Sequence, residues 1–209
     1  SMEQLDIEVK DMAKEIMTIA AAVRTHKASL VENVSMLTHT LWPDSRVEVF
    51  GSYATGLDLP GSDVDCVICD VEEHYNGIMR GLASPCLPRL LSKLSEAPWV
   101  LSAEAITQTA VPVIKVLAVS GQHNHANIRM DISFDGPRHR GVSTAAFIRQ
   151  AVTQHPALVP VSVVFKHMLV THNLNEPFLG GISSYAVVLL VLAVLKEYPA
   201  LPAVLTDMP

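Results

Sequence analysis

The spacing of apolar residues changes along the chain from helical to extended and then back to helical. Residues 5–41 repeat apolar positions at helical spacing, which predicts two consecutive amphipathic helices that end at Trp42-Pro43-Asp44. Short β-branched runs at 47–50 and 64–69 enclose a glycine-rich segment. This pattern predicts a strand, then a loop or short helix, then a second strand.

Further extended segments follow, with one helix before them. A helix is predicted over residues 87–94, because Pro88 is tolerated in a first helical turn and Pro98 marks the end. Residues 100–107 and 111–119 are strand candidates, and residues 128–134 alternate apolar and polar side chains with a period of two. The chain is therefore predicted to be α/β (α+β), with a small four- or five-stranded mixed sheet.

The C-terminal part returns to helical spacing, over residues 144–154, 161–172 and 183–198. We expect residues 1–45 to form N-terminal helices that belong to a central helical domain, and residues 46–138 to form the sheet domain. Residues 139–209 would be the rest of the helical domain. We expect that domain to be truncated, because the chain ends directly after an apolar helix with few others to pack against.

Three features of the sequence bear on where in the cell the protein is expected to be. The most apolar run, residues 186–195, is much shorter than the roughly 20 residues that a membrane-spanning helix needs. The N-terminus is polar and acidic and does not resemble a signal peptide. Three cysteines cannot all pair, which favours a reducing compartment. Cys66 and Cys69 would point to opposite faces of one strand, so we interpret them as small strand residues.

The charge balance argues against an extended surface for nucleic acid. The chain has 15 Lys and Arg against 21 Asp and Glu, a formal net charge of -6. The long-range field therefore repels phosphate polymers. Contact with a nucleic acid must be local or supplied by a partner, and binding of the isolated chain should be weak and sensitive to salt.

Three aspartates carry the chemistry that the sequence predicts. Asp63 and Asp65 lie two residues apart at the start of an apolar strand, and so on one face of it. Asp131 lies on the polar face of the alternating strand. Close carboxylates repel one another unless a cation bridges them, and carboxylate oxygens suit Mg²⁺ or Mn²⁺. Two such ions can serve the attacking and the leaving oxygen of a phosphoryl transfer.

A phosphate-binding turn accompanies these carboxylates. Gly51 lets the backbone approach a triphosphate, and Ser52 offers amide and hydroxyl donors. The alternative is that Asp63 only begins a strand after a turn and that Asp131 is an ordinary solvent-facing residue. The combination of Gly-Ser, a ten-residue spacer, Asp-x-Asp and a later strand aspartate favours catalysis.

Four segments resemble the Trf-type poly(A) polymerases of the DNA polymerase beta-like nucleotidyltransferase superfamily. Residues 49–68, VFGSYATGLDLPGSDVDCVI, resemble the catalytic loop of this family. Residues 110–115, AVPVIK, and 130–134, MDISF, resemble the strands leading to and carrying its third aspartate. Residues 174–185, LNEPFLGGISSY, resemble its nucleotide-facing loop. The resemblance implies a palm domain over 46–138 and ATP bound in a cleft beside the helical domain.

The resemblance also implies roles for individual residues. Two magnesium ions would be held by Asp63, Asp65 and Asp131, which would be the catalytic residues. The nucleotide-binding residues would be Gly51, Ser52, Thr144, Lys166, Ser184 and Tyr185. Lys166 would contact phosphates and Tyr185 would stack on the incoming base. From the residues alone, Lys166 is equally well interpreted as a solvated helix lysine. A core tyrosine is the alternative for Tyr185, but the preceding Gly180-Gly181 and the free amides of a first helical turn favour a phosphate site.

The implied reaction is template-independent transfer of AMP from ATP to an RNA 3' end, in nuclear RNA surveillance. The resemblance implies a zinc-knuckle RNA-binding protein and an RNA helicase as partners, no membrane, and a nuclear location with the cytoplasm as the alternative. An RNA uridylyltransferase is the nearest alternative. Val170 stands where such relatives carry a second phosphate-binding lysine, which favours adenylate. A non-catalytic nucleotide-binding scaffold is the alternative of another class.

Four other polar residues were not assigned to the site. His123, His125 and His139 flank the Asp131 strand without the spacing of metal ligands, and we expect them to be solvated turn residues. Asp135 would lie on the same face of the strand as Asp131, but it borders Gly136-Pro137, where the strand should end.

Overall fold

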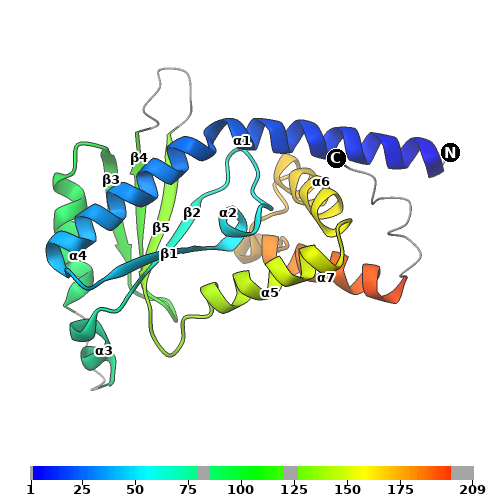
Figure 1. The fold of residues 1–209 in the computed structure, drawn as a ribbon. Coiled ribbons are helices and arrows are strands. Elements are labelled where there is room, and N and C mark those ends of the chain that lie inside the picture. Colours follow the sequence, from blue (N-terminus) through cyan, green and yellow to red (C-terminus); the bar gives the residue numbers. More distant parts are fainter. Residues whose placement is uncertain (1, 80–84, 120–126, 199–209) are drawn as a thin grey trace. The chain divides into compact units, whose positions relative to one another are not determined.

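The computed structural model of the chain describes residues 2–79, 85–119 and 127–198 (Figure 1). The helices in these ranges are α1 (Met2–Leu41), α2 (Gly51–Thr55), α3 (Glu72–Met79), α4 (Cys86–Glu96), α5 (Gly141–Gln154), α6 (Leu158–Thr171), the 3-10 helix η1 (Pro177–Leu179) and α7 (Ser184–Glu197). The strands are β1 (Arg46–Phe50), β2 (Val64–Cys69), β3 (Val100–Ile106), β4 (Val113–Ala118) and β5 (Ile128–Phe134).

The strands of the described residues form one five-stranded mixed sheet in the order β1-β2-β5-β4-β3. The β2 and β5 pair is parallel, and the other neighbours are antiparallel. Strands β2 and β5 are far apart in sequence, and their parallel pairing brings the Asp-x-Asp strand beside the Asp131 strand. The predicted mixed α/β sheet is confirmed.

The chain divides into two compact units, which we describe separately. Unit 2 comprises residues 23–54 and 62–144 and contains the whole sheet. One face of this sheet packs against α4 and the second half of α1 (Figure 1). The residues buried there alternate along the strands, as a sheet with one covered face requires. The strands contribute Val64, Cys66, Ile68, Ile114, Val116, Met130 and Ile132 to this core, and the helices contribute Leu90, Leu94 and Val34.

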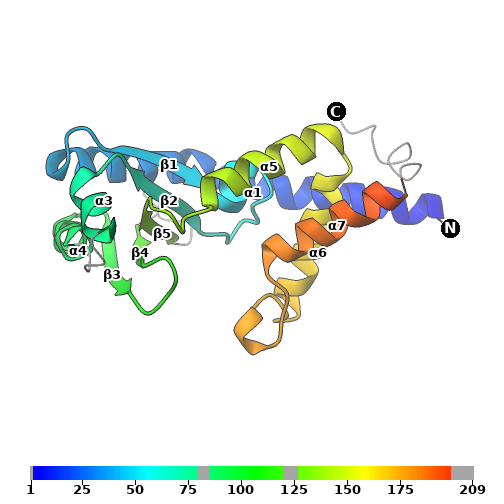
Figure 2. The ribbon, with the colours of Figure 1, turned by 90° about the horizontal axis from the view of Figure 1, so that it is seen from below.

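Unit 1 comprises residues 1–22, 55–61 and 145–209 and is helical in its described part. Helices α6 and α7 run side by side, and the loop between them contains η1 (Figure 2). The core of the unit gathers Ile16, Leu57, Ile148, Val163 and Val188 from separate segments. None of the helices that the structure describes is long and apolar enough to cross a membrane.

Two sequence predictions of local structure were wrong. The first forty or so residues form one helix, α1, rather than two. The buried face of the helix continues without a break through Ala20, Lys27 and Leu30. Because Lys27 is polar, the apolar pattern of this face is interrupted in the sequence although the helix is not. Helix α3 was not predicted, because its sequence EEHYNGIM is polar and includes a central Asn-Gly pair. The segment after β1, left open between loop and short helix, begins with the short helix α2.

The compact units do not coincide with the domain boundaries expected from sequence. Residues 23–41 of α1 belong to the sheet unit, because Leu30 and Val34 pack in its core, whereas residues 55–61 belong to the helical unit. The division into domains at 1–45, 46–138 and 139–209 stays a prediction.

The cysteines agree with their interpretation as structural residues. Cys66, Cys69 and Cys86 are buried free thiols. Burial, with a smaller effect of neighbouring Asp65, raises the pKa of the Cys66 thiol to about 12. A thiol with so high a pKa stays protonated and is a poor nucleophile at neutral pH.

Candidate functional site

Strand register brings the predicted carboxylates together on one face of the sheet. Asp65 of β2 pairs directly with Asp131 of β5, and Asp63 comes just before β2. The intervening residues Val64 and Met130 are fully buried on the face that packs against α1 and α4. Side chains alternate along a strand, so the aspartates lie on the opposite face.

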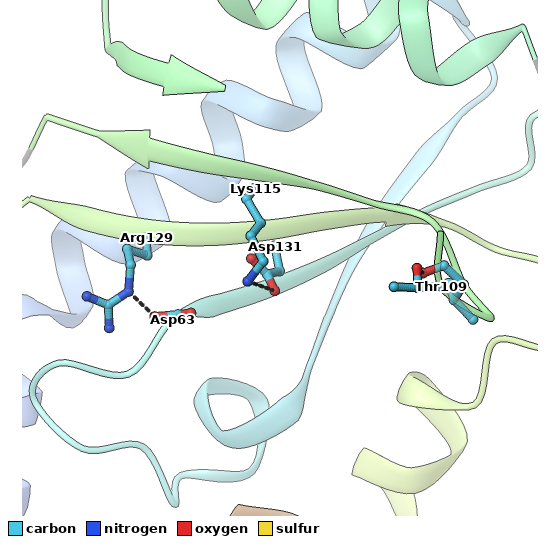
Figure 3. Close-up of polar contacts among 6 residues, drawn as sticks. Asp63, Thr109, Lys115, Arg129 and Asp131 are labelled. Carbon is cyan, nitrogen blue, oxygen red and sulfur yellow. Dashed lines mark hydrogen bonds and ion pairs between the residues drawn. The ribbon is translucent and has the colours of Figure 1, made fainter. Parts of the chain in front are cut away.

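Asp63 and Asp131 form ion pairs with basic side chains (Figure 3). Arg129 Nε donates to Asp63 Oδ1 at 2.7 Å, and Lys115 Nζ donates to Asp131 Oδ2 at 3.4 Å. Lys115 is the register partner of Asp131 on β4, and Arg129 lies two residues before Asp131 on β5. Both cations therefore come from the face that carries the carboxylates.

The surroundings of Asp131 change how readily its carboxyl group takes up a proton. Burial raises the pKa of its carboxyl above the ordinary value, Lys115 lowers it, and neighbouring Asp63 raises it again. The net direction is upward, so the local environment still favours neutralisation of this carboxylate. A divalent cation would supply that neutralisation.

Gly51 occupies a position that no other residue fits without strain. It has φ of 66°, in the left-handed region, where the chain turns from β1 into α2. A Cβ atom on Gly51 would overlap the carboxylate of Asp65. The predicted Gly51 and Ser52 turn therefore lies against one of the predicted acidic residues, within unit 2.

The three aspartates could bind a hard divalent cation, because they offer carboxylate oxygens and because the strand register brings them to one face of the sheet. Mg²⁺ prefers carboxylate oxygens and keeps several waters, and it does not require a closed protein cage. Among the described residues, however, no three or more His, Cys, Asp and Glu side chains are arranged as a ready metal site. The carboxylates of Asp63 and Asp131 are directed to Arg129 and Lys115 instead.

The remaining predicted residues lie in three different surroundings. Thr144 is in the first turn of α5, at the end of unit 2. Ser184 and Tyr185 begin α7 in unit 1 and are exposed, and the preceding Ser183 caps this helix by accepting from the Ala186 amide. Lys166 is only 3% exposed and donates to the Leu57 carbonyl oxygen. The solvated-lysine reading of Lys166 is wrong, because its ammonium group is buried in unit 1.

The histidine prediction needs one correction. His139 is not a solvated turn residue: its Nε2 lies 3.1 Å from Ser133 Oγ, and its ring packs edge-on against Phe50. His123 and His125 lie outside the described residues. Asp135 directly follows β5, where its amide donates to the Ile68 carbonyl oxygen.

Two residues of this site were missed by sequence reasoning, namely Lys115 and Arg129. Both lie on the polar side of their alternating strands, which was visible in the sequence. What was not visible was the strand order, which places Lys115 opposite Asp131.

Comparison with known proteins decides the family. Residues 5–149 match the family described as "Poly(A) RNA polymerase, mitochondrial-like, central palm domain". This match covers most of the chain and includes all three aspartates. The chain belongs to the non-canonical poly(A) RNA polymerase family.

The relatives of this polymerase-family chain include proteins named as poly(A) RNA polymerases and one named as inactive. The "Poly(A) RNA polymerase cid14" of Schizosaccharomyces pombe is 37% identical over 84% of this chain. The "Inactive non-canonical poly(A) RNA polymerase protein Trf4-2" of Drosophila melanogaster is 30% identical over 82% of this chain. The chain spans 24% of the first and 39% of the second, and so covers only part of these relatives.

Solved structures share the fold of this family member. The polymerase core of TRAMP, an RNA surveillance complex, is 26% identical with a TM-score of 0.70, and the match covers 97% of this chain and 62% of that one. A mutant of the Cid1 poly(U) polymerase bound to MgATP is 20% identical with a TM-score of 0.78, covering 93% of this chain and 57% of that one. The second likeness shows the fold alone.

Proposed function

We propose that this chain is the catalytic part of an enzyme that transfers AMP from ATP to the 3' end of an RNA without a template. The observation that carries the proposal is the pairing of Asp65 with Asp131 in register on adjacent parallel strands, with Asp63 beside them. Kinship with poly(A) RNA polymerases supports adenylate as the transferred group.

Asp63, Asp65 and Asp131 would hold Mg²⁺ or Mn²⁺ in this reaction. When bound, such ions lower the pKa of a hydroxyl and offset negative charge on phosphate oxygens. The three carboxylates then fix where the RNA 3' hydroxyl and the triphosphate meet, which supplies much of the rate by placement. The 3' hydroxyl releases its proton to solvent, its oxygen bonds to the α-phosphorus, the bond from that phosphorus to the β-phosphate oxygen breaks, and pyrophosphate leaves.

The remaining predicted residues would bind the nucleotide. Gly51 has no side chain and would let the backbone of the turn approach the phosphates, and Ser52 would donate hydrogen bonds to the phosphate oxygens. Exposed Tyr185 would stack on the base and Ser184 would contact the triphosphate. Thr144 would contact the ribose. Lys166 would contact a phosphate only if its ammonium group gave up the hydrogen bond to the Leu57 carbonyl oxygen for one to the phosphate.

The proposed setting is nuclear RNA surveillance, with the cytoplasm as the alternative location. Likeness to the polymerase core of TRAMP supports this setting. A net charge of -6 supports the proposal that RNA affinity comes from partners, of which we propose a zinc-knuckle RNA-binding protein and an RNA helicase.

Primer extension tests the proposal. The full-length protein is given a short RNA, Mg²⁺ and each ribonucleoside triphosphate in turn, and then ATP and UTP in competition. We expect ATP to be incorporated preferentially, and UTP preference would instead establish the uridylyltransferase that the Cid1-like fold allows. If an Asp63→Ala, Asp65→Ala double variant extends the primer as well as wild type, these aspartates do not carry catalysis.

An inactive relative makes a non-catalytic scaffold the second candidate. In that case the wild-type protein would bind MgATP and extend no primer with any nucleotide. Wild-type extension that the double variant abolishes would exclude the scaffold as the whole function.

A further inference from the structure

The two ion pairs at the carboxylates join half-buried acids to exposed bases. The side chains of Asp63 and Asp131 are 32% and 26% exposed, whereas those of Arg129 and Lys115 are 61% and 56% exposed. Figure 3 shows Arg129 beside Asp63 and Lys115 beside Asp131. A long exposed side chain can leave such a pair without disturbing the sheet, because exposed ion pairs are weak.

Strand register gives Lys115 a second carboxylate on its other side. Lys115 pairs with Asp131 on β5 and with Glu104 on β3, and Asp131 pairs with Asp65 on β2. Residues paired across a ladder share a face, with Cβ atoms about 4.5–5.5 Å apart. The sheet therefore carries a transverse row in the order Glu104, Lys115, Asp131, Asp65. Lys115 therefore has one carboxylate as its register partner on each neighbouring strand.

We propose that Arg129 and Lys115 are exchangeable counter-ions that a divalent cation must displace from Asp63 and Asp131, and that Glu104 receives Lys115 when it is displaced. This inference rests on the proposed function, since it concerns the same carboxylates. Before the metal binds, the two bases hold the like charges of the aspartates together on one face. The bases are positioning residues in this role, because they act through the aspartates.

Competition of this kind has a measurable consequence for metal affinity. The probe is Mn²⁺, titrated into the full-length protein without nucleotide or RNA, and free Mn²⁺ is measured by electron paramagnetic resonance. The Arg129→Gln and Lys115→Gln variants should each bind Mn²⁺ about two- to five-fold more tightly than wild type, the range that a weak exposed ion pair gives. Circular dichroism checks that the variants are folded.

A matched control separates displacement from a general loss of positive charge. Lys93 is an exposed base of the same unit that pairs with Glu96 on α4, at 2.8 Å. Lys93→Gln removes the same charge and should leave Mn²⁺ affinity unchanged. Equal tightening in the Lys93, Lys115 and Arg129 variants would overturn the proposal.

The role of Glu104 is tested by a double-mutant cycle. Glu104→Gln should weaken Mn²⁺ binding in the wild-type background, because Lys115 then has no second carboxylate. In the Lys115→Gln background the same change should have little effect, and an equal effect in both backgrounds would refute the transfer of Lys115.

Asp65→Asn distinguishes failure of this inference from failure of the proposed function. Lys115 and Arg129 pair with Asp131 and Asp63, so Asp65→Asn removes a proposed metal ligand while both of those acids stay in place. If Asp65→Asn leaves Mn²⁺ binding unchanged, the proposed metal site fails and the counter-ion inference fails with it. If Asp65→Asn abolishes binding but the Arg129 and Lys115 variants bind like wild type, only the counter-ion inference fails.

Discussion

Replacing Gly51 by alanine is expected to damage the site through one identifiable contact. Gly51 has φ of 66°, where an alanine costs about 1–2 kcal/mol relative to the right-handed region. In addition, the new Cβ atom would overlap the carboxylate of Asp65. Either the turn or Asp65 must then move. A displacement of about 1 Å at a catalytic group can lower the rate roughly a hundredfold.

Gly56 provides a control for the backbone effect. It also has positive φ, 74°, but a Cβ atom there would meet nothing within 4 Å. Gly56→Ala should therefore lower the free energy of unfolding by about 1–2 kcal/mol in urea titrations followed by circular dichroism, and Gly51→Ala should lower it by at least as much. Only Gly51→Ala should also lower Mn²⁺ affinity and primer extension.

Two outcomes with these variants would contradict a role for the contact between Gly51 and Asp65. If Gly51→Ala binds Mn²⁺ and extends primers as Gly56→Ala does, the close approach of the turn to Asp65 has no functional role. If Gly56→Ala loses activity to the same extent, strain in the loop rather than contact with Asp65 explains the effect.

Other variants test packing and titration. Lys166→Met should lower the free energy of unfolding by about 1–3 kcal/mol without any nucleotide present, because the Leu57 carbonyl oxygen loses its buried donor. The exposed Lys196→Met should change it by less than about 0.5 kcal/mol, and equal effects would contradict the buried role. Burial lowers the pKa of His74 below its ordinary 6.5, so the unfolded chain takes up this proton first as pH falls. Stability should therefore decrease from pH 7 toward pH 5, and His74→Gln should flatten that decrease; an unchanged slope would refute the assignment. The pKa of His139 is lowered by burial in the same direction, so His139→Gln should flatten the decrease further.

The strands of the site could be predicted from the sequence because one face of the sheet packs into the core. Residues 128–132 alternate in the sequence as they do in burial, with Met130 and Ile132 inside and Arg129 and Asp131 toward the other face. The short apolar run of β2 was also readable, since β-branched residues bounded by turn signals indicate a buried strand. These local rules were enough to place all three aspartates on polar positions.

The ion pairs could not be predicted, because they depend on strand order. No local pattern states that β4 lies beside β5, and only that order places Lys115 opposite Asp131. The unbroken course of α1 was missed for a different reason. A lysine at a buried stripe position, Lys27, cannot be distinguished in sequence from the end of an amphipathic helix.

The most direct measurement compares primer extension by wild-type protein and by Asp65→Asn, in Mg²⁺ with ATP as the only nucleotide. We predict that wild type lengthens the RNA by adenylates and that the variant, although folded, does not. Equal extension by both proteins would contradict the claim that these paired strand carboxylates carry out nucleotide transfer.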